Sequence, residues 1–135
     1  MNKKQLFPDK LSETSGPYSH GTLVKLSDVD LIFVSGQVSV DAKGNTVGKG
    51  DVALQTEQVL KNLQGVLEAS GTSLAHVVKV TVFLRNIEDR NAVAEVRKRF
   101  FKDNLPASTL VEVSKLVDQD WLIEIEAIAV APRHG

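Results

Sequence analysis

The feature that most constrains the fold is the apolar run at residues 122–130, close to the end of the chain. Its alternation predicts a strand, because successive side chains of a strand point to opposite faces. One set of alternate positions is wholly apolar and must face a core: Ile123, Ile125, Ala127 and Ala129. The other set places Glu124 and Glu126 among large aliphatic residues, which is unusual for a solvated face. We therefore expect something else to cover this second face, most simply another subunit.

A second run rich in β-branched residues, 105–113, precedes the first and contains the breaker Pro106. It predicts a strand, and we expect these two strands to be neighbours in a sheet. Further strands are predicted at about 22–26 and 31–36, joined as a hairpin, and at 77–84. Residues 1–15 show no period and predict an irregular arm.

Two segments have the apolar spacing of amphipathic helices, at 51–70 and at 89–102. Asp51 is suited to cap the first helix. The second places Val93, Val96 and Phe100 on one stripe, and its basic residues are interpreted as a solvated side: Arg90, Arg97, Lys98 and Arg99. The chain is thus predicted to form one α+β domain over residues 1–135, with about six strands and two helices on one face of the sheet.

Composition excludes several classes of function. A formal net charge of -1 gives no electrostatic case for nucleic acid or an anionic membrane. The chain has no cysteine, so disulfides, thiolate metal sites and cysteine nucleophiles are ruled out. Neither His20, His76 nor His134 has ligand spacing to another histidine, so we expect no metal site. With no leader-like or membrane-spanning apolar run, we expect a cytoplasmic location.

Two short segments concentrate polar groups on constrained backbone. Gly16-Pro17 predicts a turn that carries Tyr18 and His20, for which the simplest interpretation is structural: Tyr18 packs as a plug and His20 caps a neighbouring carbonyl. Ser35-Gly36 follows the apolar residues 31–34, which predict a strand covered on both sides. A glycine there permits close backbone approach, as at small-ligand sites.

Short motifs spread in order over almost the whole chain resemble the reactive intermediate deaminase (Rid) family. They are Gly16-Pro17-Tyr18, Ser35-Gly36-Gln37, the helix at 51–70, the strand at 78–84, Phe100-Phe101, Pro106-Ala107, Val111-Glu112-Val113 and residues 123–129. The resemblance implies a chorismate-mutase-like fold of the bacillus type. It also implies a homotrimer with three clefts between subunits, which accounts for the half-apolar face around Glu124 and Glu126.

The resemblance further implies cofactor-free hydrolysis of 2-imino and 2-enamino acids to 2-keto acids and ammonia. On the family pattern Glu126 and Tyr18 would be catalytic, and the substrate-binding candidates are Ser35, Gly36, Ser108, Thr109 and Phe83. Two positions depart from the pattern: Ser108 stands where the family has a carboxylate-binding arginine, and Ala94 where many members have an asparagine. A neutral hydroxyl binds a carboxylate less strongly than a guanidinium, by about 2 to 3 kcal/mol.

We therefore expect a trimer that binds a small metabolite, without nucleic-acid or membrane partners, and that is not an efficient 2-iminobutanoate or 2-iminopropanoate deaminase. Two alternatives stay open at this point. One is a non-catalytic trimer that senses a ligand or binds a protein; the other, with the least support, is RNA cleavage or translation inhibition. Glu126 itself has a structural interpretation, as a strand carboxylate paired with a neighbouring backbone or lysine.

Overall fold

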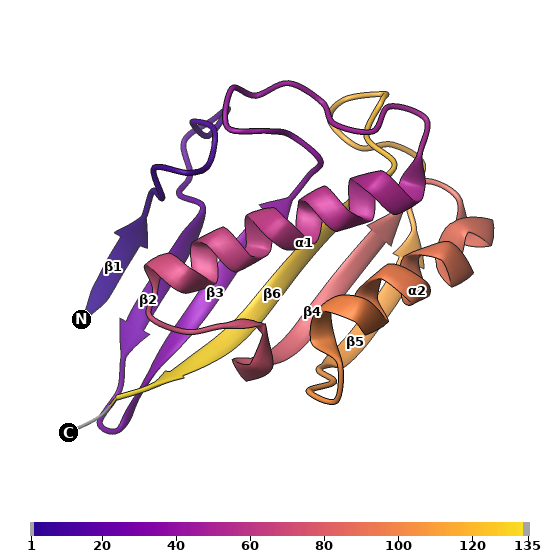
Figure 1. Ribbon diagram of the computed structural model, residues 1–135. Helices are drawn as coiled ribbons and strands as arrows, with labels where there is room; N and C mark the ends of the chain where they lie inside the picture. The colour runs from indigo at the N-terminus through magenta and orange to yellow at the C-terminus, as the bar shows by residue number, and fades with distance from the viewer. Residues whose placement is uncertain (1, 134–135) are drawn as a thin grey trace.

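The computed structural model describes residues 2–133, which form one mixed six-stranded sheet with two long helices packed on it (Figure 1). In chain order the elements are β1 (Lys3–Leu6), β2 (Gly21–Lys25), β3 (Val29–Gln37), α1 (Val52–Ala69), the one-turn η1 (Leu74–His76), β4 (Val77–Leu84), the one-turn η2 (Ile87–Asp89), α2 (Arg90–Phe101), β5 (Ala107–Glu112) and β6 (Ile123–Pro132). The predicted α+β architecture, the hairpin and both helices are confirmed. None of the described helices is long and apolar enough to cross a membrane.

The strand order is β1-β2-β3-β6-β4-β5. The prediction that the last two strands of the chain are neighbours is therefore wrong, because β4 lies between them. β6 is antiparallel to both β3 and β4, whereas β5 runs parallel to β4 at the sheet edge. The residues explain the difference. β6 has a fully apolar side and can occupy the centre, while β5 carries Ser108, Thr109 and Glu112, which suit an edge strand.

The prediction of an irregular N-terminal arm is wrong for residues 3–6, which pair with β2 as an edge strand. The strand escaped detection because it is short and buries only one of its side chains, Leu6. A second correction concerns β4, where the register shifts between Val77 and Lys79. Val77 is buried as a result and Val78 is exposed, although simple alternation assigned Val78 to the core.

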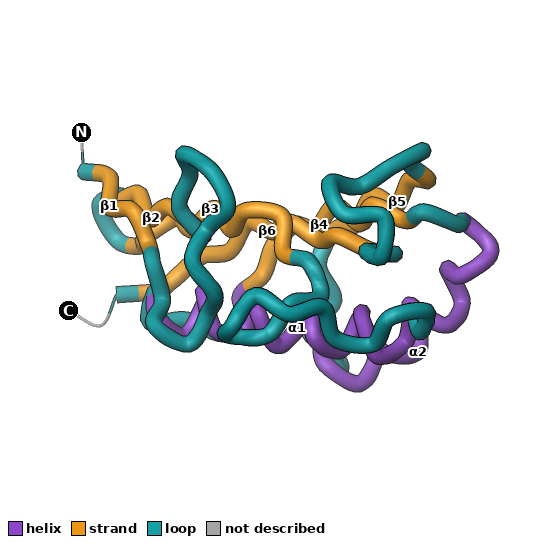
Figure 2. The backbone as a smooth tube through the Cα atoms, turned by 90° about the horizontal axis from the view of Figure 1, so that it is seen from above, coloured by secondary structure: helices purple, strands orange, loops and turns teal. Residues whose placement is uncertain are grey.

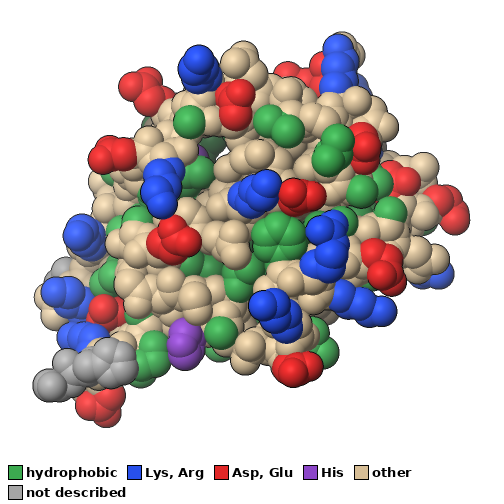
Figure 3. All heavy atoms as spheres, in the orientation of Figure 1, with side chains coloured by type: hydrophobic (Ala, Val, Ile, Leu, Met, Phe, Trp, Pro, Cys, Tyr) green, Lys and Arg blue, Asp and Glu red, His purple; other side chains and the backbone are tan. Residues whose placement is uncertain are grey.

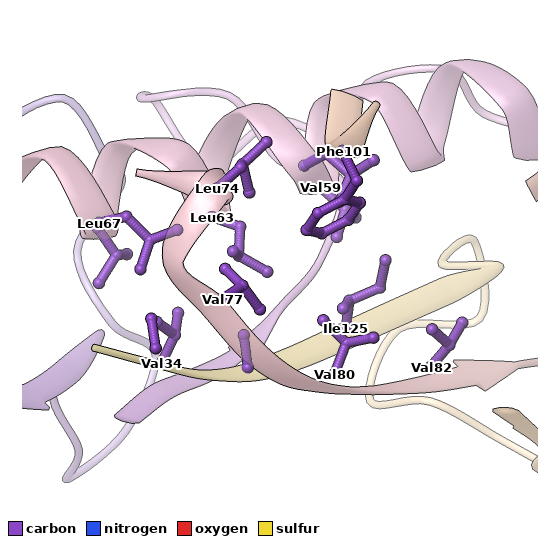
Figure 4. Packing of buried hydrophobic residues seen from close by; sticks show 14 of the residues in the cluster. Val34, Val59, Leu63, Leu67, Leu74, Val77, Val80, Val82, Phe101 and Ile125 are labelled. Atoms are coloured by element: carbon purple, nitrogen blue, oxygen red, sulfur yellow. The ribbon is translucent and has the colours of Figure 1, made fainter. Parts of the chain in front are cut away.

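Both helices lie on the same side of the sheet, as the view in Figure 2 shows. The core is the layer between the helices and the sheet. In this layer α1 contributes Val59, Leu63 and Leu67, β4 contributes Val80 and Val82, and β6 contributes Ile125 (Figure 4). α1 begins at the predicted cap, since the Asp51 carboxylate accepts a hydrogen bond from the Leu54 backbone N–H at 3.1 Å. From α2 the core takes Val93, Val96 and Phe101, with Phe100 partly buried beside them.

Candidate functional site

The side of the sheet away from the helices is open in the chain. Cross-strand pairs on it are Phe33 with Ile128, Thr81 with Glu126, Phe83 with Glu124, and Thr109 with Thr81. Large apolar side chains stay exposed there, such as Phe33 with 41% of its surface accessible. Residues 31–34 are therefore covered on one side only within this chain, and covering the other side requires a second molecule. We name the surface made by these seven side chains and their neighbours the open face.

Glu124 and Gly36 meet at one end of the open face. β3 shifts register between Val34 and Gln37, so that its backbone bends where Gly36 lies. The Glu124 side chain occupies the space that a side chain at position 36 would need, and any Cβ there would collide with its carboxyl. Burial, and secondarily the charge of Glu126, raise the pKa of the Glu124 carboxyl above its ordinary value. Glu124 is thus a partly buried carboxyl that lies over the backbone at Gly36.

Ser35 and Glu126 line a different hollow on the same face, of about 220 Å³, together with Phe33 and Ile128. The Ser35 hydroxyl donates to the Ser19 carbonyl at 2.7 Å, so its proton is already engaged. Glu126 is exposed. The two predicted residues lie together, and Glu126 is more exposed than Glu124.

The loop before β2 is fixed by His20, as the structural interpretation expected. Its Nε2 lies 2.7 Å from the Ser12 carbonyl, and its Nδ1 lies 3.2 Å from the Gln37 amide nitrogen. The neutral tautomer with the proton on Nε2 satisfies both contacts, since Gln37 then donates to Nδ1. The Tyr18 ring is 49% exposed and is not a plug. It lines a hollow of about 150 Å³ with Gly36 instead.

Ser108 lies apart from the other predicted residues. It pairs in register with Val80, whose side chain is buried under the helices, so Ser108 faces the helix side of β5. Its hydroxyl accepts a hydrogen bond from Arg97 Nη2 at 2.9 Å. Thr109, the next residue, is on the open face and accepts a hydrogen bond from Lys79 Nζ at 2.6 Å.

The prediction that Arg97 belongs to a solvated basic side is therefore wrong. Over the helices as a whole, Lys and Arg side chains are interspersed with Asp and Glu (Figure 3), but Arg97 is only partly exposed and turns toward β5. The sequence held a signal for this. Arg97 lies four residues after Val93 and four before Phe101, both of which are buried, so it continues the inner side of α2.

Within one chain, then, the open face brings together Ser35, Gly36, Phe83, Thr109 and Glu126, with Tyr18 beside Gly36. It does not include Ser108. β6 and β4 separate β3 from β5, and three strand spacings amount to about 14 Å. The sequence-based choice included neither Glu124 nor Arg97, because the family resemblance pointed to Glu126 and Arg97 was interpreted as part of a solvated basic side.

Comparison with known proteins gives consistent results. The family model described as Endoribonuclease L-PSP matches residues 9–131. A RutC family protein of Pyrococcus abyssi is 41% identical over 96% of this chain and 98% of its own. The human 2-iminobutanoate/2-iminopropanoate deaminase is 40% identical over 85% of this chain and 80% of its own.

A crystal structure of the E. coli protein TdcF with bound serine superimposes with a TM-score of 0.82, at 32% identity, over 97% of this chain and 99% of that one. The sheet order, the two helices on one side and the matches along the sequence all agree with the predicted family. The chain belongs to the Rid (YjgF/RidA) family.

Proposed function

We propose that three copies of this chain enclose clefts in which a small imino-acid-like metabolite is bound and its C=N bond hydrolysed, without efficient turnover of 2-iminobutanoate or 2-iminopropanoate. The single observation that carries the proposal is the partly buried Glu124 carboxyl against Gly36 on a sheet face that the chain leaves open. A human relative is named for imine deamination, and an E. coli relative binds serine, which supports a ligand of this class.

The placement of the polar groups supports a site shared between subunits. Gly36 and Glu124 are on the open face, whereas Ser108 and Arg97 are at the far edge of the sheet and on its helix side. In one chain the strands of Gly36 and Ser108 are roughly 14 Å apart and those of Glu124 and Ser108 roughly 10 Å, and the two groups lie on opposite sides of the sheet, so a small metabolite cannot bridge them. If the edge of one subunit meets the open face of the next, both groups border one cleft, and the exposed Phe33 and Ile128 are covered.

Hydrolysis of a protonated imine consumes one water and yields a ketone and ammonium. The water oxygen bonds to the imine carbon while Glu124 accepts one water proton. That proton then passes to nitrogen, and the C–N bond breaks with its electrons on nitrogen to release ammonia. The hydroxyl oxygen forms the carbonyl, and its proton passes through Glu124 to the ammonia, which leaves as ammonium. The raised pKa of Glu124 makes its carboxylate a stronger base for the first of these proton transfers.

Glu126 stays the sequence-based candidate for the same role, and two single variants separate it from Glu124. Imine would be generated from 2-aminobutanoate by an amino-acid oxidase, with semicarbazide trapping the fraction that escapes hydrolysis. We expect Glu124→Gln to lower the measured rate by about 10² to 10⁴, and Glu126→Gln to lower it far less. The reverse ranking would assign the base to Glu126 and contradict our choice of Glu124.

Ser108 accounts for the expected weakness toward simple imino acids and gives a second test. A Ser108→Arg variant alone would place two guanidinium groups side by side, because Arg97 already contacts this position. The informative variant is therefore Ser108→Arg with Arg97→Gln. We expect it to hydrolyse 2-iminobutanoate at least ten times faster than wild type.

A folded but silent double variant would support the non-catalytic alternative, in which the trimer only binds its ligand. Wild type and Glu124→Gln proteins that are equally inactive would also support this non-catalytic alternative. A wild type that is already as fast as an arginine-containing relative would refute the proposed weakness toward simple imino acids.

A further inference from the structure

A hollow of about 230 Å³ lies between the second half of α2 and the loop that leads into β5. Four of its lining residues are apolar and two are basic: Ala94, Phe101, Leu105 and Pro106, with Arg97 and Lys98. Ala94 and Arg97 are one helical turn apart, and both line the hollow. The hollow combines an apolar wall with positive charge and has the size of a small-metabolite site.

Arg97 has too few partners for its position. It is partly buried, and that burial lowers the pKa of its guanidinium, which nevertheless stays cationic at neutral pH. Its neighbour Lys98 pairs with Glu95 at 3.5 Å, but none of the ion pairs found among residues 2–133 involves Arg97. The side-chain partner that it has is the neutral Ser108 hydroxyl. A partly buried guanidinium whose side-chain partner is a neutral hydroxyl can accept an anion as a charged partner.

The shape of the guanidinium narrows the ligand class. One terminal nitrogen, Nη2, donates to the Ser108 hydroxyl. A planar carboxylate can accept two parallel hydrogen bonds from the fork of a guanidinium, and this geometry distinguishes it from a monodentate halide. Phe101, Leu105 and Pro106 offer contact to a short hydrocarbon portion beside that carboxylate.

We infer that Arg97 is the carboxylate-binding residue of the ligand site, with Ser108 as the residue that positions its guanidinium. The inference deepens the proposed function and rests on it for the claim that the bound carboxylate belongs to the substrate. It also reconciles binding with slow turnover. A carboxylate held from α2 instead of β5 sits differently with respect to Glu124, and small displacements of a bound substrate slow the attack of water.

The test is a calorimetric titration of the intact protein with 2-oxobutanoate, the stable keto-acid product, and with uncharged 2-butanone as the matched ligand. Wild type is expected to bind 2-oxobutanoate and to show no measurable affinity for 2-butanone. Arg97→Met should weaken 2-oxobutanoate binding at least about tenfold. Arg97→Lys should remain closer to Arg97→Met than to wild type, because an ammonium lacks the planar fork.

Two further variants distinguish a specific site from general attraction by positive charge. Arg99→Met removes an exposed cation of the same helix and should leave binding unchanged. Ser108→Ala keeps the charge but frees the guanidinium, so it should weaken binding by less than Arg97→Met. Equal losses in Arg97→Met and Arg99→Met, or equal affinity for the keto acid and for 2-butanone, would overturn the inference.

Binding and hydrolysis can fail separately in these experiments. A wild type that is silent in the semicarbazide assay but binds 2-oxobutanoate through Arg97 would refute hydrolysis and leave the inference intact. A wild type that hydrolyses imines while Arg97→Met keeps both rate and affinity would overturn the inference and leave the proposed function standing. Failure of wild type to bind 2-oxobutanoate at all would also overturn it.

Discussion

The two faces of β6 are made from nearly the same residue types and have opposite surroundings. Ile125 points into the layer under the helices and is 1% exposed, whereas Ile128, on the other face, remains partly exposed. Helices from the same chain cover the first face, and no described residue covers the second in the same way. An apolar pattern therefore tells which side chains require cover but does not tell whether the cover comes from the same molecule.

The difference between the faces also separates the roles of their polar groups. On the helix side the strands contribute apolar residues to the core, and the buried polar side chains Gln55 and Asn62 of α1 donate hydrogen bonds to backbone carbonyls. On the open face Glu124, Glu126, Thr81 and Lys79 stand between Phe33, Phe83 and Ile128. In a core the charged groups of this mixture would lack partners, and on a free surface its large apolar side chains would be exposed to water. It fits a subunit interface that encloses small polar clefts, which is the arrangement that we propose.

The largest expected effect comes from a charge on the inner face. Ile125→Asp removes a buried side chain worth about 1.5 to 3 kcal/mol and buries a carboxylate at a cost of several more. Together these approach the whole stability of a typical domain, about 5 to 15 kcal/mol. We expect the variant to be unfolded or insoluble by circular dichroism and sedimentation. A cooperatively folded Ile125→Asp protein would contradict the burial of this face.

The matched change on the open face should spare the fold and break the assembly. In Ile128→Asp the new carboxylate would lie opposite Lys79, which is its cross-strand partner and can balance the charge. We expect circular dichroism like that of wild type, and sedimentation of a monomer where wild type sediments as a trimer at micromolar concentration. The reason is that an interface would have to bury three copies of the added charge.

Ile128→Leu is the control, since it keeps an apolar side chain at the same position and should remain trimeric. A wild type that is monomeric and stable at micromolar concentration would remove the proposed clefts. A trimeric Ile128→Asp protein would place the interface somewhere other than the open face.

Sequence patterns predicted most of the fold because the strands and helices follow strong local periods. α1 and α2 were located to within about a residue. The errors occurred where the outcome depends on partners distant in the sequence. β1 has no period of its own and forms by pairing with β2, and β6 enters between β3 and β4 although β5 precedes it in the chain. Strand order depends on which strands pair along their edges, and local sequence patterns carry no information about these distant partners.

The candidate site was less predictable for the same reason. Ser35, Gly36 and Tyr18 were chosen from the family resemblance, and they lie at the two hollows beside the open face. The contact between Glu124 and Gly36 depends on a register shift in β3 that no residue pattern announces. Arg97 was assigned to solvent because basic residues on a helix usually are solvated, although its spacing from the buried Val93 and Phe101 and its contact with Ser108 indicate otherwise.

The smallest effect that we predict is a change in the pH dependence of stability when Glu124 is neutralised. In the folded chain burial, and then the charge of Glu126, raise the pKa of Glu124 above its ordinary 4.5. Between the ordinary value and the raised one the folded state holds more protons than the unfolded state, so stability falls as pH rises through this window. Above the folded pKa the whole penalty for the buried charge is present, and below the ordinary pKa it is absent.

Glu124→Gln carries no ionisable group at this position and should lack that fall. Its free energy of unfolding in urea should therefore exceed that of wild type at about pH 8 and converge with it near pH 4, at matched protein concentration. Glu126→Gln removes only the smaller of the two causes of the raised Glu124 pKa. It should therefore reduce the fall of stability with pH less than Glu124→Gln does. If wild type instead gains stability relative to Glu124→Gln as pH rises, the carboxyl is stabilised in its charged form, and the open face holds a partner for it that the isolated chain does not supply.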